Sequence, residues 1–218
     1  MIKILIFIIL CFIVSTEAVF AEIWDFGLGI SHVSGRSDNY GTVPLQIEMG
    51  LSSVKGYGLS VSRQSTKSFS NLTKKEIIED NTYSSEFGMR SDTLMIFYRF
   101  ENYDQRWDLG LMNNRNIYIA TIEKKGSSSE IGSSHINISY SGPYIQYSNT
   151  LKGYETDDWY YGLRIFSIST NNIDSSSYNI IVSDDNYLQD YNNDIKKFIY
   201  KNNPKNATGI NITLGWRL

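Results

Sequence analysis

Cysteine is almost absent from this chain of 218 residues, which has one, Cys11, inside an N-terminal apolar run. The rest of the chain therefore cannot be one of the small secreted folds that depend on disulfides. A lipoprotein signal needs a small residue just before its cysteine, and Leu10 stands there, so lipid attachment is not expected. Proline is also scarce, with three residues, while tyrosine is abundant, with 16, and this composition favours strands over helices or linkers.

Sequence motifs for catalysis, metal binding and nucleotide binding are missing too. The chain has no CxxC, no HExxH, no phosphate-binding glycine loop and no run of Lys or Arg that would suggest a nucleic-acid surface. The acidic pairs Asp157-Asp158 and Asp184-Asp185 could contact a divalent cation, but we interpret them as solvated loop charges. The sequence predicts no catalytic residue, no cofactor-binding residue and no metal site.

Residues 1–21 have the features of a secretory signal peptide. Lys3 supplies a positive charge, residues 4–14 form an apolar run of 11 residues, and Val19 and Ala21 occupy the −3 and −1 positions of a cleavage site. The run is too short for a membrane-spanning helix, which needs roughly 20 residues. We expect cleavage after Ala21, which leaves 22–218 as one folded domain.

After residue 21, apolar and polar residues alternate instead of forming long apolar runs. In 24–31 every even-numbered residue is apolar and every odd-numbered residue is Asp, Gly or Ser. A two-residue period sustained over about ten residues is typical of a tilted membrane strand. The sequence therefore predicts an all-β domain, an antiparallel up-and-down transmembrane β-barrel of eight strands. The expected strands are 24–31, 45–52, 57–62, 93–100, 107–119, 136–147, 159–165 and 209–218.

Loop lengths and aromatic residues give this barrel a direction. A barrel with both chain ends in the periplasm has short inner turns and long outer loops. The short connections are 54–56, 101–106 and 149–157, and the long or polar ones are 34–42, 65–91, 124–134 and 170–206. Trp and Tyr concentrate at membrane interfaces because their rings are apolar and their N–H or O–H groups are polar. The predicted periplasmic strand ends carry Trp24, Trp107, Trp159, Trp216, Tyr57, Tyr98 and Tyr147.

The polar faces of these strands favour a membrane barrel over a soluble one. A lipocalin-like barrel also alternates, but its polar face contacts water and should carry long charged side chains. Here the polar faces are mostly Gly, Ser, Thr and Asn. Such small residues fit the crowded interior of a narrow barrel.

The last expected strand, 209–218, carries a family resemblance. Its even-numbered residues, from Ile210 to Leu218, share one apolar face. It resembles the C-terminal strand of bacterial outer-membrane barrels, which usually ends in an aromatic residue, whereas here Trp216 precedes the terminal Leu218. The whole layout is similar to the small eight-stranded, OmpA/OmpX-like barrels. The resemblance implies a monomer in the bacterial outer membrane that contacts lipid and lipopolysaccharide, is recognised by the barrel-assembly machinery through this strand, and binds no nucleic acid.

Three kinds of function are compatible with such a barrel. The first is a non-enzymatic role through surface loops, in adhesion, surface interaction or envelope integrity. The second is a narrow pore, and the third is an outer-leaflet lipid enzyme such as a lipid A deacylase or phospholipase, which would need a Ser–His pair. The two histidines, His32 and His135, each follow a serine. We predict His32 on the lipid side and His135 on the lumen side, which disfavours the enzyme.

The alternation also assigns side chains to the lumen or to lipid. We expect an ionic network that fills the lumen and blocks ion flow, because unpaired buried charges are costly. The charged residues predicted to face inward are Asp25, Glu48, Arg99, Asp108, Arg164 and Arg217. Those predicted to face acyl chains are Leu28, Ile47, Ile96, Leu163 and Ile212.

Two further assignments concern the strand at 136–147. We expect Gly142-Pro143 to form a bulge, so that Ile136, Ile138 and Tyr140 share the lipid face with Ile145 and Tyr147. Ser139 would then face the lumen, as Ser60 does on its own strand.

The long connection 170–206 also contains a helical pattern. Its apolar residues recur at i, i+3, i+7, i+10 and i+11, which predicts an amphipathic helix of about three to four turns on the outer side. They are Leu188, Tyr191, Ile195, Phe198 and Ile199, preceded by the N-cap candidates Ser183, Asp184 and Asp185 and followed by the helix-stopping Pro204. The apolar stripe should be buried across the barrel mouth or on the outer leaflet.

Overall fold

The structure is a computed structural model. It describes residues 22–33, 45–53, 55–65, 77–80, 82–102, 105–126, 130–150, 158–174, 178–180, 186–202 and 205–218. The predicted signal peptide, the predicted loop 34–42, the N-cap candidates 183–185 and the helix-stopping Pro204 lie outside these ranges. Within the described part, no helix is long and apolar enough to cross a membrane.

Eight antiparallel strands form a closed ring, as the alternation predicts. They are β1 (Glu22–Val33), β2 (Leu45–Ser53), β3 (Tyr57–Ser65), β5 (Tyr83–Asn102), β6 (Gln105–Lys124), β7 (Glu130–Thr150), β8 (Asp158–Asp174) and β10 (Asn206–Arg217). Neighbours along the sheet follow the chain, β10 pairs with β1, and the pairing of β3 with β5 closes the ring. The predicted short connection 54–56 joins β2 to β3, and Gly56 has a φ of 92°, a conformation that favours glycine.

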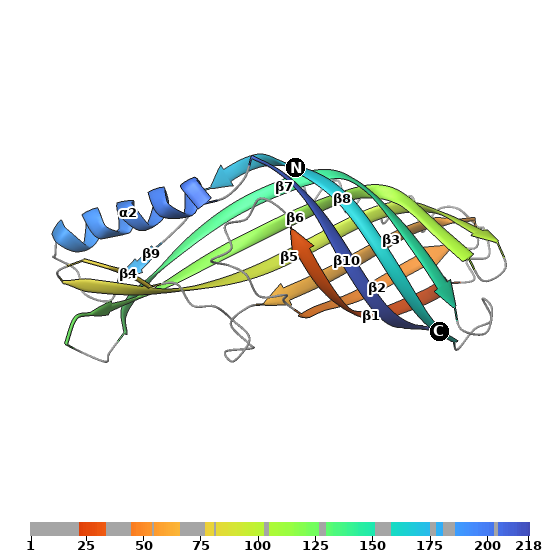
Figure 1. Cartoon of the computed structure of the whole chain (residues 1–218), viewed down its shortest axis with the longest axis horizontal. Coiled ribbons are helices and arrows are strands. Elements are labelled where there is room, and N and C mark those ends of the chain that lie inside the picture. Colours follow the sequence, from red (N-terminus) through yellow and green to blue (C-terminus); the bar gives the residue numbers. More distant parts are fainter. Residues whose placement is uncertain are drawn as a thin grey trace.

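The four strands β5 to β8 run well beyond the other four (Figure 1). β5 begins ten residues earlier than predicted, at Tyr83 instead of at residue 93. The predicted loops 65–91, 124–134 and 170–206 therefore contain strand ends, together with three further elements. These are β4 (Ile77–Glu79), β9 (Tyr178–Ile180) and the helix α2 (Asn186–Asn202). We call this part of the molecule the outer extension: β4, β9, α2 and residues 83–92, 114–124, 130–141 and 169–174 of β5 to β8.

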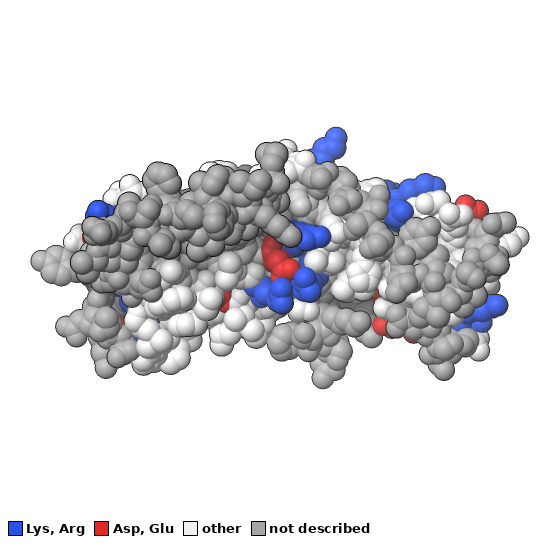
Figure 2. All heavy atoms as spheres, turned by 180° about the vertical axis from the view of Figure 1, so that it is seen from behind, with Lys and Arg blue, Asp and Glu red and all other residues white. Residues whose placement is uncertain are grey.

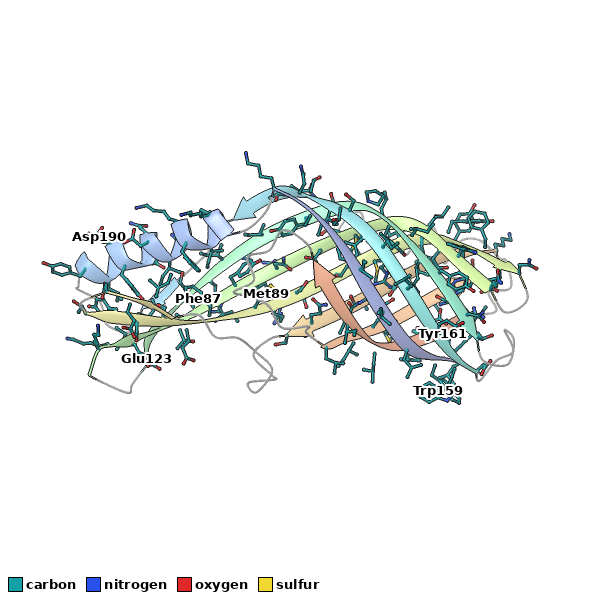
Figure 3. All side chains as sticks on the ribbon, viewed as in Figure 1. Phe87, Met89, Glu123, Trp159, Tyr161 and Asp190 are labelled. Atoms are coloured by element: carbon teal, nitrogen blue, oxygen red, sulfur yellow. The ribbon has the colours of Figure 1, made fainter. Side chains whose placement is uncertain are left out.

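The barrel is apolar outside and polar inside. Leu28, Ile47, Ile96, Leu163 and Ile212 are all exposed on the exterior, as predicted. At the chain-terminal end, pairs of aromatic rings from neighbouring strands contact one another at centroid distances of about 5 Å: Tyr57–Tyr98, Trp107–Tyr147 and Trp159–Trp216. Trp159 and Tyr161 lie at the end of the barrel farthest from α2 (Figure 3).

The predicted bulge at Gly142-Pro143 is wrong. β7 pairs with β6 through both residues without a shift, so the same parity faces inward along the whole strand. Ile136, Ile138 and Tyr140 are consequently buried, with at most 1% of their surface exposed, and do not face lipid. Ser139 lies on the opposite, outward face and is partly exposed.

A hydrophobic core fills the outer extension. The inward residues of β5, β6 and β7 and the apolar stripe of α2 pack into one cluster, which confirms the predicted helix. Its members from the helix are Leu188, Tyr191, Ile195 and Ile199, with Phe198 packed against it. α2 is longer than expected, with 17 residues. Its apolar stripe lies against the extended strands and not on the outer leaflet.

Candidate functional site

An ionic cluster centred on Asp25 fills the half of the lumen nearest the chain termini. Arg106 Nη1 lies 3.1 Å from both carboxylate oxygens of Asp25, and Arg99 Nη2 lies 2.9 Å from its Oδ2. Arg217 Nε approaches Asp25 Oδ1 at 3.6 Å. Asp25 is 5% exposed and Arg106 1%, so these charges are removed from water and depend on each other.

Two further carboxylates pair with the arginines of this cluster. Asp108 Oδ1 accepts a hydrogen bond from Arg99 Nε at 2.8 Å, and Glu101 Oε1 accepts one from Arg217 Nη2 at 2.7 Å. In these contacts, three arginines pair with three carboxylates. Four of the six are among the charged residues predicted to face inward. Arg106 and Glu101 are not, because both lie in the segment 101–106, which we interpreted as a connection between strands.

A second polar network occupies the middle of the lumen. Arg164 Nη2 donates to Glu48 Oε1 at 2.6 Å, and its Nε donates to Gln146 Oε1 at 2.8 Å. Ser60 Oγ and Gln46 Nε2 donate to the same Glu48 carboxylate. All six charged residues predicted to face inward are therefore buried and paired, and Ser60 faces inward as predicted.

Aromatic rings fill the remaining width of the lumen. The Arg106 guanidinium lies 4.9 Å from the ring centre of Tyr160, and that of Arg99 lies 4.9 Å from the ring centre of Phe97. Glycine makes room for the tyrosine ring: a Cβ added at Gly215 would meet Tyr160 Cζ at 2.2 Å. The interior is thus packed with side chains.

One small polar cavity lies on the outer side of these networks. Asn114, Gln46, Ser91 and Asn211 are among its lining residues, with Arg164 beside them. Asn114 Oδ1 is buried there without a hydrogen-bond partner, and the space suffices for about one ordered water molecule. The cavity is too small to serve as a path for solutes.

One of the two histidines, His135, does not lie where we predicted it. His135 lies on the outward face of β7, contrary to the lumen position we expected, because that position depended on the incorrect bulge. Its Nε2 lies 3.3 Å from Ser133 Oγ, and no described carboxylate orients the ring. His32 belongs to β1 and pairs through its backbone with Ile210. Among the described residues, no group of three or more His, Cys, Asp or Glu could hold a metal ion.

The helix α2 is held to the extension by directed contacts. The Tyr191 hydroxyl donates to the Ile78 carbonyl of β4, and its ring lies 5.7 Å from that of Tyr83. Burial raises the pKa of the Tyr191 phenol, in keeping with a neutral donor. Phe198 contacts Phe87 at a ring distance of 5.4 Å. Figure 3 shows Phe87 and Met89 on the strand face beneath the helix, with Asp190 on the far side of it.

The opposite face of α2 is polar and exposed. It carries acids, bases and amides rather than a patch of one charge. Its exposed residues include Tyr187, Gln189, Asp190, Asn193, Asp194, Lys197 and Lys201. The extension therefore presents a polar helix on a packed sheet, at the end opposite the aromatic rings.

Neither the comparison with protein-family models nor that with curated proteins found a match. Among solved structures, the chain is similar to a major outer membrane protein from Thermus thermophilus, with 10% identity over 91% of this chain and 100% of that one, at a TM-score of 0.47. It is also similar to Neisserial surface protein A (12% identity, 90% and 94% covered, TM-score 0.43). A third similar structure is Ail, the attachment invasion locus protein of Yersinia pestis (11% identity, 90% and 97% covered, TM-score 0.43). Similarities at this level do not assign a role.

Proposed function

We propose that this chain is a bacterial outer-membrane β-barrel that displays a folded extension at the cell surface and acts through surface interaction rather than transport or catalysis. The barrel exterior supports the membrane assignment. All eight strands of the ring carry exposed apolar side chains on the outward face, while the lumen holds paired charges. A soluble barrel would have the opposite polarity.

The aromatic end of the barrel is the periplasmic one in this proposal. Trp24 exchanges two backbone hydrogen bonds with the terminal Leu218, so the first and last strands are joined at that end. The route to the membrane is a signal peptide cleaved after Ala21 and recognition of β10 by the barrel-assembly machinery. N-terminal sequencing of protein purified from outer membranes should begin at Glu22.

The observation that carries the surface role is the hydrophobic core of the outer extension. The strand ends and α2 bury apolar residues outside the membrane barrel. In that region a barrel needs only loops to connect its strands. A packed core holds the exposed residues of α2 and of the sheet in fixed positions. Binding residues on proteins gather on such surfaces when a rigid scaffold positions them. Adhesion or contact with other envelope components fits this arrangement.

Transport is disfavoured by the filled lumen. The Asp25 and Glu48 networks and the rings of Tyr160 and Phe97 occupy the interior of a barrel that is only just wide enough for side chains. In planar bilayers the refolded protein should show no open-channel current. Regular single-channel steps from the wild type would contradict the closed lumen.

The surface role is tested by display on cells of a Gram-negative host that lacks the gene. Cells expressing the wild type should bind more strongly to at least one of three probes: immobilised fibronectin, immobilised laminin or live epithelial cells. The matched control exchanges the exposed residues Asp190, Asp194 and Lys197 for Ser and keeps the buried stripe. Equal binding by the host with and without the barrel, at equal surface levels, would refute an adhesive role. The remaining surface role would then be envelope integrity, which is measured as detergent sensitivity.

A further inference from the structure

A compact group of arginines lies on one side of the molecule, where the apolar exterior of the barrel meets the outer extension. Arg63 of β3, Arg90 and Asp92 of β5, and Arg115 of β6 all lie on the outward face. The strands are adjacent, and the backbone register places Asp92 opposite Arg63 on one side and opposite Arg115 on the other. We call these four residues the arginine cluster. Figure 2 shows basic side chains gathered around acidic atoms near the middle of the face seen from behind.

The charges of the arginine cluster do not balance. Arg63 Nε lies 2.7 Å from Asp92 Oδ1, and Arg90 Nη2 lies 3.0 Å from Asp92 Oδ2. Arg115 forms no ion pair with any described residue. Within the part of the chain that the structure describes, three guanidinium groups thus share one carboxylate, which leaves two positive charges in excess. The side chains of Arg63 and Arg90 are 63% and 43% exposed, so both can reach a ligand.

The position of the cluster points to an amphiphilic ligand. Arg63 lies two residues beyond the exposed Val61, and Asp92 lies two residues before the exposed Leu94. Arg115 lies eight residues from Trp107 of the aromatic end, which is about 26 Å along the strand. Strand tilt reduces that to about 20 Å across the membrane, comparable with the roughly 25 Å apolar band of outer-membrane barrels. A bound anion would sit where lipid headgroups meet acyl chains.

Among the described residues, the strands beside the cluster present no outward charge at that level. The residues next to the cluster in the backbone register are Ile47 on β2 and Ser139 on β7, both uncharged. Near the outer end of the apolar surface, β8 and β10 present Ser167 and Thr208 outward. The nearest outward acid on β5 is Glu86, four residues farther out than Arg90. The group is therefore a local cationic site and not part of a general ring of charges.

We propose that the arginine cluster binds a phosphate group of an outer-leaflet glycolipid whose acyl chains lie on the apolar exterior below it. A guanidinium group can donate two parallel hydrogen bonds to phosphate oxygens. No described side chain pairs with the guanidinium group of Arg115. The inference rests on the proposed membrane location and adds to it the lipid chemistry and the residues that recognise it.

The test uses the full-length mature protein refolded in detergent micelles that contain equal amounts of diphosphoryl lipid A and a dephosphorylated lipid A with the same acyl chains. Native mass spectrometry reads which lipid stays bound. The wild type should retain the phosphorylated form with a preference of about tenfold or more, as expected for a few charge-assisted hydrogen bonds. The variant Arg63→Gln/Arg90→Gln/Arg115→Gln should lose that preference.

Two further variants separate recognition from general effects. Lys197→Gln/Lys201→Gln/Lys205→Gln removes the same amount of charge from exposed outer positions and should keep the preference. Asp92→Asn removes the competing carboxylate and should strengthen it. A wild type without preference, or equal losses in the two triple variants, would overturn the proposal. Displacement of the lipid by equimolar inorganic phosphate would assign the cluster to free phosphate and also overturn it.

Folding is followed separately by the shift between boiled and unboiled protein on a gel. A heat-modifiable protein without lipid preference refutes the arginine cluster alone. A protein that is not heat-modifiable and stays soluble without detergent refutes the membrane barrel itself.

Discussion

The inward face of β7 is polar inside the barrel and apolar beyond it. Gln146 and Ser148 belong to the lumen, whereas Ile136 and Ile138, of the same parity, belong to the core of the outer extension. The outward face changes in the opposite sense, from the exposed Ile145 to Ser139. The backbone continues without a break, so the change follows the surroundings of the strand: lipid outside the barrel, and water outside the extension.

The largest expected loss of unfolding free energy follows from removing the buried charge of Asp25, in contrast to the exterior charge of Asp92. Asp25→Asn leaves Arg106, Arg99 and Arg217 without their shared carboxylate in the lumen. We expect the free energy of unfolding to fall by about 3–5 kcal/mol, measured by urea titration in lipid vesicles. The exterior Asp92→Asn, with exposed partners, should change it by about 0–1 kcal/mol. Equal losses would mean that the lumen is solvated.

A second prediction contrasts the two faces of the extension. Ile138→Ala removes a buried side chain from the core and should cost about 2–5 kcal/mol of local stability. The readout is the rate of proteolysis of the extension in protein held in vesicles. Ser139→Ala, the outward neighbour, should stay within about 0.5 kcal/mol of the wild type. Faster cleavage of the Ser139 variant than of the Ile138 variant would reverse the assignment of faces.

The exterior of the barrel gives a third contrast. Ile96→Arg places a charge against acyl chains and should reduce the unfolding free energy by about 2–4 kcal/mol. Thr121→Arg, outward on β6 in the extension, meets water and should change it by at most about 0.5 kcal/mol. Urea unfolding in vesicles measures both. If Thr121→Arg costs as much as Ile96→Arg, the extension lies in lipid.

The smallest expected effect belongs to the helix. Tyr191→Phe removes the hydroxyl that bonds to the Ile78 carbonyl and should weaken the attachment of α2 by about 0.5–1.5 kcal/mol. Hydrogen exchange of the α2 amides measures that attachment. Tyr200→Phe is the control on the same helix, because its hydroxyl bonds to no described residue. Unchanged exchange in Tyr191→Phe would show that apolar packing alone holds the helix.

Alternation predicted the barrel well because both of its faces have constant surroundings. Residues 24–31 read as even outside and odd inside, and the structure agrees up to Ser31. The helix was predictable for a similar reason, since its stripe at helical spacing meets a single packed surface. The same alternation also placed Asp25, Arg99 and Arg164 correctly in the lumen.

The outer extension was not predictable from alternation alone. Apolar residues mark the lipid face within the membrane and the buried face outside it, so Ile136 and Ile145 looked like members of one face. A bulge at Gly142-Pro143 then seemed necessary to reconcile their opposite parity. Arg106 was missed because a charged residue next to a polar segment resembles a turn. Along β7 the apolar residues switch from odd-numbered to even-numbered positions without a bulge. Such a switch would have identified the boundary between the barrel and the outer extension.

The most direct measurement of this inversion places single spin labels along β7 in the mature chain, which has no cysteine after residue 21. The labelled positions are Ile145→Cys, Ser139→Cys and Ile138→Cys, read by accessibility to oxygen in lipid and to a nickel chelate in water. We predict that Ile145→Cys is accessible to oxygen, Ser139→Cys to the nickel chelate, and Ile138→Cys to neither. If Ile138→Cys is as accessible to oxygen as Ile145→Cys, the inversion of polarity between the barrel and the outer extension is contradicted.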